Sequence, residues 1–145
     1  MIEKFGPLAG VKVIEMCHVM AGPTCGRMLA DMGADVIKVE RPGVGDETRT
    51  WGPPFIKDVG GEETTESGYY LSANRNKRSV TINIAKPKGA ALVRKMLTGC
   101  DVLIENFRVG GLAKYGLAYD NLKNDFPALV YCSITGFGQT GPYAT

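Results

Sequence analysis

The sequence predicts an α/β fold with an open, mainly parallel, Rossmann-like sheet and helices on both of its faces. Short apolar runs rich in β-branched residues alternate along the chain with segments of helical periodicity. Parallel strands need connections of helix length, and strands buried on both faces lack polar alternation, as these runs do. The length of 145 residues, 44% of them apolar, suffices for one domain with a core. We therefore expect residues 1–145 to form a single α/β unit.

The first forty residues contain a strand, a helix and a second strand. Residues 12–16 (KVIEM) form a short apolar run that predicts a strand. Pro23 fits the first turn of a helix that continues through Met32 and stops at Gly33. Residues 35–40 (DVIKVE) predict the second strand. Together these elements form a βαβ unit.

The next segment has no sustained periodicity. Residues 42–68 are rich in glycine and proline and predict a long loop, and loops of this length are usually functional or mobile. Residues 67–73 are expected to form one or two helical turns, and residues 74–78 (NRNKR) a polar turn. A third strand is then predicted at 79–84 (SVTINI).

The last third of the chain continues the alternation of helices and strands. Lys86-Pro87 starts a helix that runs to Leu97, and Gly99 is its stop signal. The elements predicted beyond it are a strand at 102–105, short helical pieces at 110–115 and 119–124, and a strand at 129–134.

Charge and hydropathy exclude several classes of function. The 17 Lys and Arg residues nearly balance the 15 Asp and Glu residues, which indicates neither a nucleic-acid surface nor a disordered chain. No apolar run approaches the roughly 18–20 residues of a membrane-spanning helix, and the N-terminal MIEKFGPLAG resembles neither a secretory nor a transit segment. We expect a cytoplasmic protein that binds neither nucleic acid nor membrane. The mitochondrial matrix is the alternative if a transit peptide precedes this sequence.

The cysteines predict no metal site and no disulfide framework. Cys17, Cys25, Cys100 and Cys132 form no CxxC pair, and the chain has a single histidine to add to them. Free thiols in a reducing compartment are therefore expected.

Open α/β sheets bind ligands beyond the carboxyl ends of their strands, so these ends hold the candidate binding residues. After the first strand, residues 17–23 (CHVMAGP) lead into a helix whose N-terminal N–H groups and dipole favour an anion. Only Gly22 and Gly26 match a GxGxxG pattern, and a tight strand-to-helix turn explains them equally well. His18, the only imidazole, either contacts a ligand or binds the backbone, and its spacing from the serines indicates no Ser-His-Asp triad.

The end of the second strand carries a more specific side chain. In dinucleotide-binding folds, the position of Glu40-Arg41 faces the adenosine ribose, where an arginine binds a ribose phosphate. Arg41 therefore indicates coenzyme A or NADP, or else it is a solvated arginine. The basic run at 75–78 either forms a solvated turn or attracts a phosphate group near the same edge of the sheet.

Two later strand ends also offer binding groups. Asn106 and Phe107 provide an amide and an aromatic face near the cations Arg108 and Lys114, or else they cap a helical turn and fill the core. The glycine-rich residues 133–142 (SITGFGQTGP) form a loop whose backbone can approach a ligand closely.

Taken together, seven segments of the chain resemble the class III coenzyme A transferases, the family of the formyl-CoA and carnitine-CoA transferases. Their order and register make the resemblance far more specific than any one segment, and they span nearly the whole chain. These segments are residues 7–15 (PLAGVKVIE), 18–23 (HVMAGP), 29–41 (LADMGADVIKVER), 45–46 (GD), 74–79 (NRNKRS), 101–107 (DVLIENF) and 133–142 (SITGFGQTGP).

The resemblance implies that residues 1–145 form the CoA-binding, Rossmann-like N-terminal portion of a larger protein whose two chains interlock as a homodimer. Two residues depart from the formyl-CoA transferases, in which glutamine stands at Met20 and arginine at Lys114. The first departure argues against a specificity for formyl or oxalyl groups. The family's CoA contacts fall on His18, Val19, Met20, Ala21, Arg41, Ile82, Asn106, Phe107, Lys114 and Tyr115.

The resemblance also implies a reaction in which CoA passes between an acyl-CoA thioester and a carboxylic acid. An aspartate carboxylate attacks the thioester through anhydride intermediates, and that aspartate is expected beyond Thr145, so no catalytic residue is assigned within this chain. CoA is then a substrate, and no tightly bound cofactor is expected. Residues 46–55 and 131–141 look most like the succinyl-CoA:glutarate branch, which uses dicarboxylates.

Three alternatives stay open at the level of sequence. An α-methylacyl-CoA racemase shares this half-domain and uses a His and Asp pair that would also lie beyond Thr145. An NADP-dependent oxidoreductase would explain the βαβ unit and Arg41. The GxGxxG motif typical of such enzymes is missing from this sequence. A non-catalytic nucleotide-binding fragment is the third, and we expect the isolated 145 residues to transfer nothing.

Overall fold

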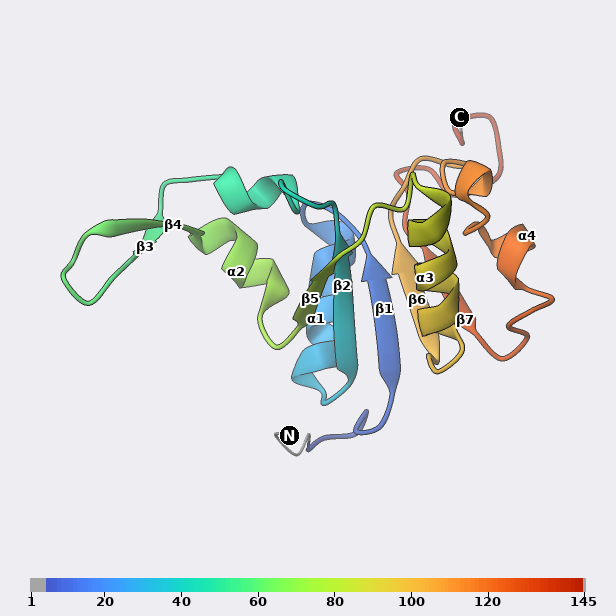
Figure 1. Cartoon of the computed structure of the whole chain (residues 1–145), viewed down its shortest axis with the longest axis horizontal. Helices are drawn as coiled ribbons and strands as arrows, with labels where there is room; N and C mark the ends of the chain where they lie inside the picture. The colour runs from blue at the N-terminus through green and yellow to red at the C-terminus, as the bar shows by residue number, and fades with distance from the viewer. Residues whose placement is uncertain (1–4, 145) are drawn as a thin grey trace.

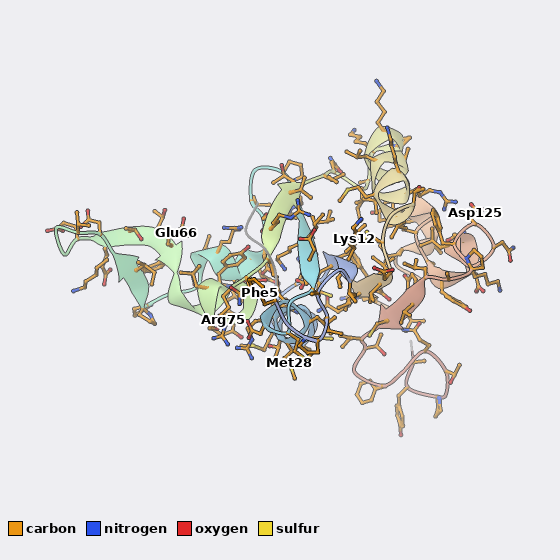
Figure 2. The ribbon with its side chains drawn as sticks, turned by 90° about the horizontal axis from the view of Figure 1, so that it is seen from below. Phe5, Lys12, Met28, Glu66, Arg75 and Asp125 are labelled. Carbon is orange, nitrogen blue, oxygen red and sulfur yellow. The ribbon has the colours of Figure 1, made fainter. Side chains whose placement is uncertain are left out.

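A computed structural model describes residues 5–144 and contains a five-stranded sheet in which every neighbouring pair of strands is parallel. The strand order is β5-β2-β1-β6-β7, with β1 at the centre (Figure 1). The predicted α/β fold with a parallel sheet is therefore confirmed. The strands are β1 (Lys12–Met16), β2 (Asp35–Glu40), β5 (Arg78–Thr81), β6 (Val102–Glu105) and β7 (Val130–Ser133).

The helices that connect these strands are short. The longest, α1 and α3, have 11 residues each. Within residues 5–144, no helix has both the length and the apolar character that crossing a membrane requires. The helices are α1 (Ala21–Asp31), α2 (Gly68–Asn74), α3 (Pro87–Leu97) and α4 (Tyr119–Leu122), with two 3-10 turns, η1 (Glu47–Thr50) and η2 (Ala113–Tyr115).

Helices α1 and α3 cover opposite faces of the sheet, as the sequence predicts (Figure 1). Successive side chains of a strand point to opposite faces, and β1 shows this alternation. Val13 packs in one core cluster with Ala30 of α1, whereas Ile14 packs in another with Val93 and Leu97 of α3. Val13 and Ile14 are both fully buried, so neither face of the central strand is open to solvent.

The prediction of a long loop over residues 42–68 is wrong. This segment holds η1 and a two-stranded antiparallel hairpin, β3 (Phe55–Lys57) and β4 (Glu63–Ser67), which extends away from the main sheet (Figure 1). Asp58 closes the hairpin turn by accepting hydrogen bonds from the N–H groups of Gly60 and Glu62. The strand β4 reads ETTES and is largely exposed, so it carries no apolar alternation by which a sequence would indicate a strand.

The third predicted strand, 79–84, is also too long at its end. Strand β5 ends at Thr81, and the chain turns at Asn83. The Asn83 side chain accepts a hydrogen bond from Ala85 N at 3.1 Å, and its carbonyl accepts one from Lys86 N at 3.1 Å. Asparagine thus offers the backbone a turn that competes with the strand, although the apolar Ile82 and Ile84 continue the pattern.

The glycines of α1 let the helix lie directly against the end of β1. A Cβ on Gly22 would overlap with the side chain of Cys17, and a Cβ on Gly26 would overlap with the carboxylate of Glu15. Both partners are fully buried. The incomplete glycine pattern therefore has a packing role in this turn.

Gly26→Ala should lower the free energy of unfolding by about 3 kcal/mol, because the new methyl group displaces a buried, ion-paired carboxylate. Urea denaturation of the chain measures this loss. Gly99→Ala is the matched control, since a Cβ there meets no atom within 4 Å. An equal response of the two variants would contradict the close contact between α1 and Glu15.

Candidate functional site

A cavity of about 540 Å³ opens at the carboxyl ends of β1 and β2, where the sequence places the binding residues. Five of the ten predicted CoA contacts line it, and these come from five separate segments of the chain. They are His18, Arg41, Ile82, Phe107 and Tyr115. Other lining residues include Met16, Val39, Glu40, Gly45, Glu47 and residues 83–85.

The turn after β1 is fixed by side chains of other elements. Lys38 Nζ of β2 donates to the carbonyl of Cys17 at 2.7 Å. Asn106, which follows β6, accepts from His18 N at 2.9 Å and donates to His18 O at 2.8 Å. Asp46 Oδ1 accepts from Val19 N at 3.4 Å. Three distant segments therefore hold three successive residues of this turn.

Val19 has the most unusual backbone conformation of the turn. Its φ of 66° lies in the left-handed region, which a β-branched residue rarely adopts because its Cβ crowds the backbone. The contacts of the neighbouring residues with Lys38, Asn106 and Asp46 hold this conformation in place.

The side chains of Cys17 and His18 are held uncharged. Burial, followed by the nearby Glu15 carboxylate, raises the pKa of the Cys17 thiol, so no thiolate forms at neutral pH. Burial lowers the pKa of His18 and outweighs the opposite effect of Asp46. The His18 ring meets the Phe107 ring edge to face, with centroids 5.7 Å apart. The turn therefore offers an aromatic surface without a charge.

Arg41 is the cation that the cavity leaves available. It follows β2 and is exposed, and within residues 5–144 its guanidinium makes no hydrogen bond and no ion pair. The neighbouring Glu40, by contrast, is 2% exposed and fully bonded. An unpaired guanidinium in a cavity with the apolar side chains of Val39 and Ile82 suits a phosphorylated ligand with an apolar ring.

Glu40 is the centre of a hydrogen-bond network beside the cavity. Arg49 binds both of its carboxylate oxygens, at 2.7 and 2.8 Å, and Ser79 and Tyr70 donate to Oε1 at 2.6 and 3.0 Å. Asp46 N donates to Oε2 at 2.8 Å. Burial alone would raise the pKa of Glu40, but these hydrogen bonds lower it to about 2.

Sequence reasoning did not predict a second buried network, which lies under the turn. Lys38 Nζ contacts Glu15 Oε1 at 3.1 Å and Asp46 Oδ2 at 2.9 Å, and all three side chains are at most 1% exposed. Lys77, at 2% exposure, contacts Glu15 Oε2 at 2.7 Å and Pro23 O at 2.8 Å. Charged residues in the middle of apolar strand runs were the available signal, because burial on both faces forces such charges to pair.

The other predicted contacts lie around the first cavity without lining it. The amide of Asn106 is bonded to the His18 backbone, so this residue positions the turn. Lys114 Nζ lies 5.0 Å from the centroid of the Tyr115 ring, over which it makes a cation–π contact. Met20, 40% exposed, precedes the first residue of α1, Ala21, which lines a second cavity.

The basic run at 75–78 is occupied by ion pairs. Arg75 binds Asp31 at 2.8 Å, and Arg78 binds Asp35 at 2.6 Å. With the Lys77–Glu15 pair, three cations of this run are held in ion pairs within the fold. The run therefore has a structural role, and the alternative that it attracts phosphate is not supported.

The unfolding free energy should fall as the pH drops from about 4.5 toward 2, because the pKa of Glu40 is depressed from 4.5 to about 2 in the fold. The contribution of Glu40 is complete above its unfolded pKa and is on the order of 3 kcal/mol. Glu40→Gln removes this dependence, so the stability difference between wild type and variant should shrink across that window. A difference that stays constant from pH 5 to pH 2 would contradict the depressed pKa.

Lys38→Met should lower the unfolding free energy by about 3–5 kcal/mol, because it leaves the buried carboxylates of Asp46 and Glu15 without a shared cation. Thermal or urea denaturation measures the loss. Lys12→Met, at an exposed position of β1, is the control and should change stability by about 0.5 kcal/mol or less. Similar losses in both variants would show that the Lys38 ion pairs are not what stabilises the turn.

Known proteins resemble this chain over nearly all of its length. A family model described as CoA-transferase family III matches residues 8–145. A succinate–glutarate CoA-transferase of Agrobacterium fabrum is 58% identical over 138 residues, and a human succinyl-CoA:glutarate CoA-transferase is 52% identical over 136. These matches cover 95% and 94% of this chain but 34% and 30% of the relatives. The chain therefore spans about a third of their length.

Solved structures give the same result. A CAIB/BAIF family protein from Brucella suis is 55% identical, with a TM-score of 0.87 over 96% of this chain and 36% of that one. A hypothetical protein from Mycobacterium tuberculosis is 35% identical, with a TM-score of 0.83 over 97% of this chain and 37% of that one. The sequence segments, the parallel sheet and the match over residues 8–145 agree, and the chain belongs to CoA-transferase family III.

Proposed function

We propose that this chain supplies the nucleotide site of an enzyme that transfers CoA between an acyl-CoA thioester and a carboxylic acid. The observation that carries the proposal is Arg41, an unpaired guanidinium at the carboxyl end of β2 in a cavity of a family III chain. CoA differs from most adenine nucleotides by a phosphate on the ribose, and this position of the fold suits such a phosphate.

The cavity offers complementary chemistry for the remainder of the nucleotide. Val39, Ile82 and Ile84 provide an apolar wall for adenine, while Arg41 binds the ribose phosphate. His18 and Phe107 lie on the side toward β1 and β6 and contact the pantetheine arm. We propose CoA contacts at His18, Val19, Met20, Ala21, Arg41, Ile82, Phe107, Lys114 and Tyr115, with Asn106 positioning the turn.

The role of these residues is to bind and orient a substrate. Glu40, Asp46 and Cys17, which lie beside the cavity, are not suited to attack the thioester, because both carboxylates are held by hydrogen bonds or ion pairs and the thiol stays protonated. We propose that the nucleophile is an aspartate carboxylate in a part of the transferase outside residues 1–145. Its oxygen forms the bond to the thioester carbonyl carbon while the CoA thiolate leaves, and the thiolate then attacks the aspartyl carbonyl of this anhydride and releases the donor acid. The acceptor carboxylate attacks the resulting aspartyl-CoA thioester and frees the thiolate again. The thiolate finally attacks the acceptor acyl carbon of this second anhydride, which gives the new thioester and regenerates the aspartate.

The partners and the compartment follow from the same proposal. The acceptor is a carboxylic acid, with dicarboxylates favoured by the named relatives, and CoA acts as a substrate and not as a bound cofactor. We propose a homodimer of the whole transferase in the cytoplasm, or in the mitochondrial matrix if a transit peptide precedes the chain. The family match gives the NADP-dependent oxidoreductase no support, and the relatives named above are transferases, not racemases.

In the transferase that carries this chain, Arg41→Ala should raise KM for CoA thioesters about 10- to 150-fold, the equivalent of about 1.5–3 kcal/mol for a charge-assisted contact. KM for 3′-dephospho-CoA thioesters should change little, because they lack the phosphate. Steady-state kinetics with both thioesters measures the difference.

Arg78→Ala is the matched control, since Arg78 pairs with Asp35 at the opposite end of the strands and is 61% exposed. It should leave both KM values unchanged. If Arg41→Ala affects the two thioesters equally, Arg41 does not bind the ribose phosphate.

A further inference from the structure

Glu105, the last residue of β6, is the one buried carboxylate that has no cationic partner within residues 5–144. It is 5% exposed and forms no ion pair, although Arg108 lines the same third cavity, of about 610 Å³. A buried charge without a cation is stable only where hydrogen-bond donors compensate it. The other three buried carboxylates all pair with a lysine or an arginine, and they are Glu15, Glu40 and Asp46.

The donors that compensate Glu105 come from two different loops. Its Oε2 accepts a hydrogen bond from Phe107 N at 2.8 Å, and its Oε1 accepts one from the Ser133 hydroxyl. Ser133 Oγ in turn accepts from Gln139 Nε2 at 2.8 Å. The carbonyl of Glu105 also accepts from Ile134 N at 2.9 Å. A single residue therefore joins the turn after β6 to the loop after β7.

These two loops border the space that a long ligand would cross. Phe107 lines the first cavity, which contains Arg41, and also a second cavity of about 890 Å³ at the carboxyl ends of β6 and β7. Residues 134–137 of the loop after β7 line the second cavity as well. A ligand that extends from Arg41 into the second cavity passes Phe107, so the separation of this ring from the loop sets the shape of the passage.

We propose that Glu105 is a positioning residue, which holds Phe107 and the loop after β7 in place so that the pantetheine end of CoA is oriented. The inference rests on the proposed function and adds to it a residue that acts through others. Glu105 lines neither the first nor the second cavity, so it works through Phe107 and Ser133 and not by contact with CoA. A carboxylate suits this role because its two oxygens accept from both donors at once, whereas an amide offers one acceptor oxygen.

The test compares two probes in the transferase that carries this chain, CoA and adenosine 3′,5′-bisphosphate, which is the nucleotide end of CoA alone. Glu105→Met has a similar size but no acceptor oxygen, so it should weaken the binding of CoA about tenfold. Binding of the bisphosphate should not change. Glu105→Gln keeps one acceptor oxygen and should restore part of the loss, and Ser133→Ala should give a smaller loss of the same kind. Isothermal titration calorimetry measures each dissociation constant.

Asp120→Asn is the matched control, because Asp120 lines the same third cavity as Glu105 but is 82% exposed and pairs with Lys123. It should bind both probes as the wild type does. A purely structural role of Glu105 would weaken both probes alike, so an equal loss for CoA and the bisphosphate overturns the inference. Unchanged binding of CoA by Glu105→Met, or no recovery in Glu105→Gln, overturns it as well. If Glu105→Met does not fold, Glu105→Gln and Ser133→Ala decide by the same comparison of probes.

No binding of either probe by the wild type would instead overturn the proposed function. Hydrogen exchange at Phe107 N–H in the ligand-free protein then still tests the inference. Glu105→Met should make this exchange faster, because the amide loses its acceptor. An unchanged exchange rate would overturn the role of Glu105 in holding the turn.

Discussion

The ammonium group of Lys38 is the contact on which the rest of the site depends. It lies on the second strand, at most 1% exposed, and joins Glu15 of the central strand, Asp46 of the following loop and the carbonyl of Cys17. A buried charge is stable only when its partners are complete, so this group fixes the relative positions of three segments. The unusual backbone at Val19 and the close packing of α1 against Glu15 both lie next to it.

Much of the fold could be predicted because its strands are buried on both faces. Residues 12–16, 35–40 and 102–105 were predicted with their observed bounds, and the helix over 87–97 began and ended where proline and glycine indicated. The hairpin at 55–67 could not be predicted, because hydrogen bonds of its turn and not burial define it. The pairing of Lys38 with Glu15 was also hidden, since it depends on the register of two strands.

The candidate site was predictable to the extent that strand ends define it. The rule that ligands lie at the carboxyl ends led to His18, Arg41 and Phe107, which the fold gathers in one cavity. What the rule could not show is where each polar atom finds its partner. Asn106 has the right place for a ligand contact but bonds the backbone of His18.

The left-handed backbone at Val19 is held by side chains from other segments of the chain. Its backbone is imposed by side chains from elsewhere and not by the residues of the turn, so the shape of the loop and its chemical identity are uncoupled. Met20 can then be exchanged for a polar side chain without any remodelling of the main chain. A single replacement at this position therefore changes the side chain that the turn presents, while Lys38, Asn106 and Asp46 keep its backbone in place.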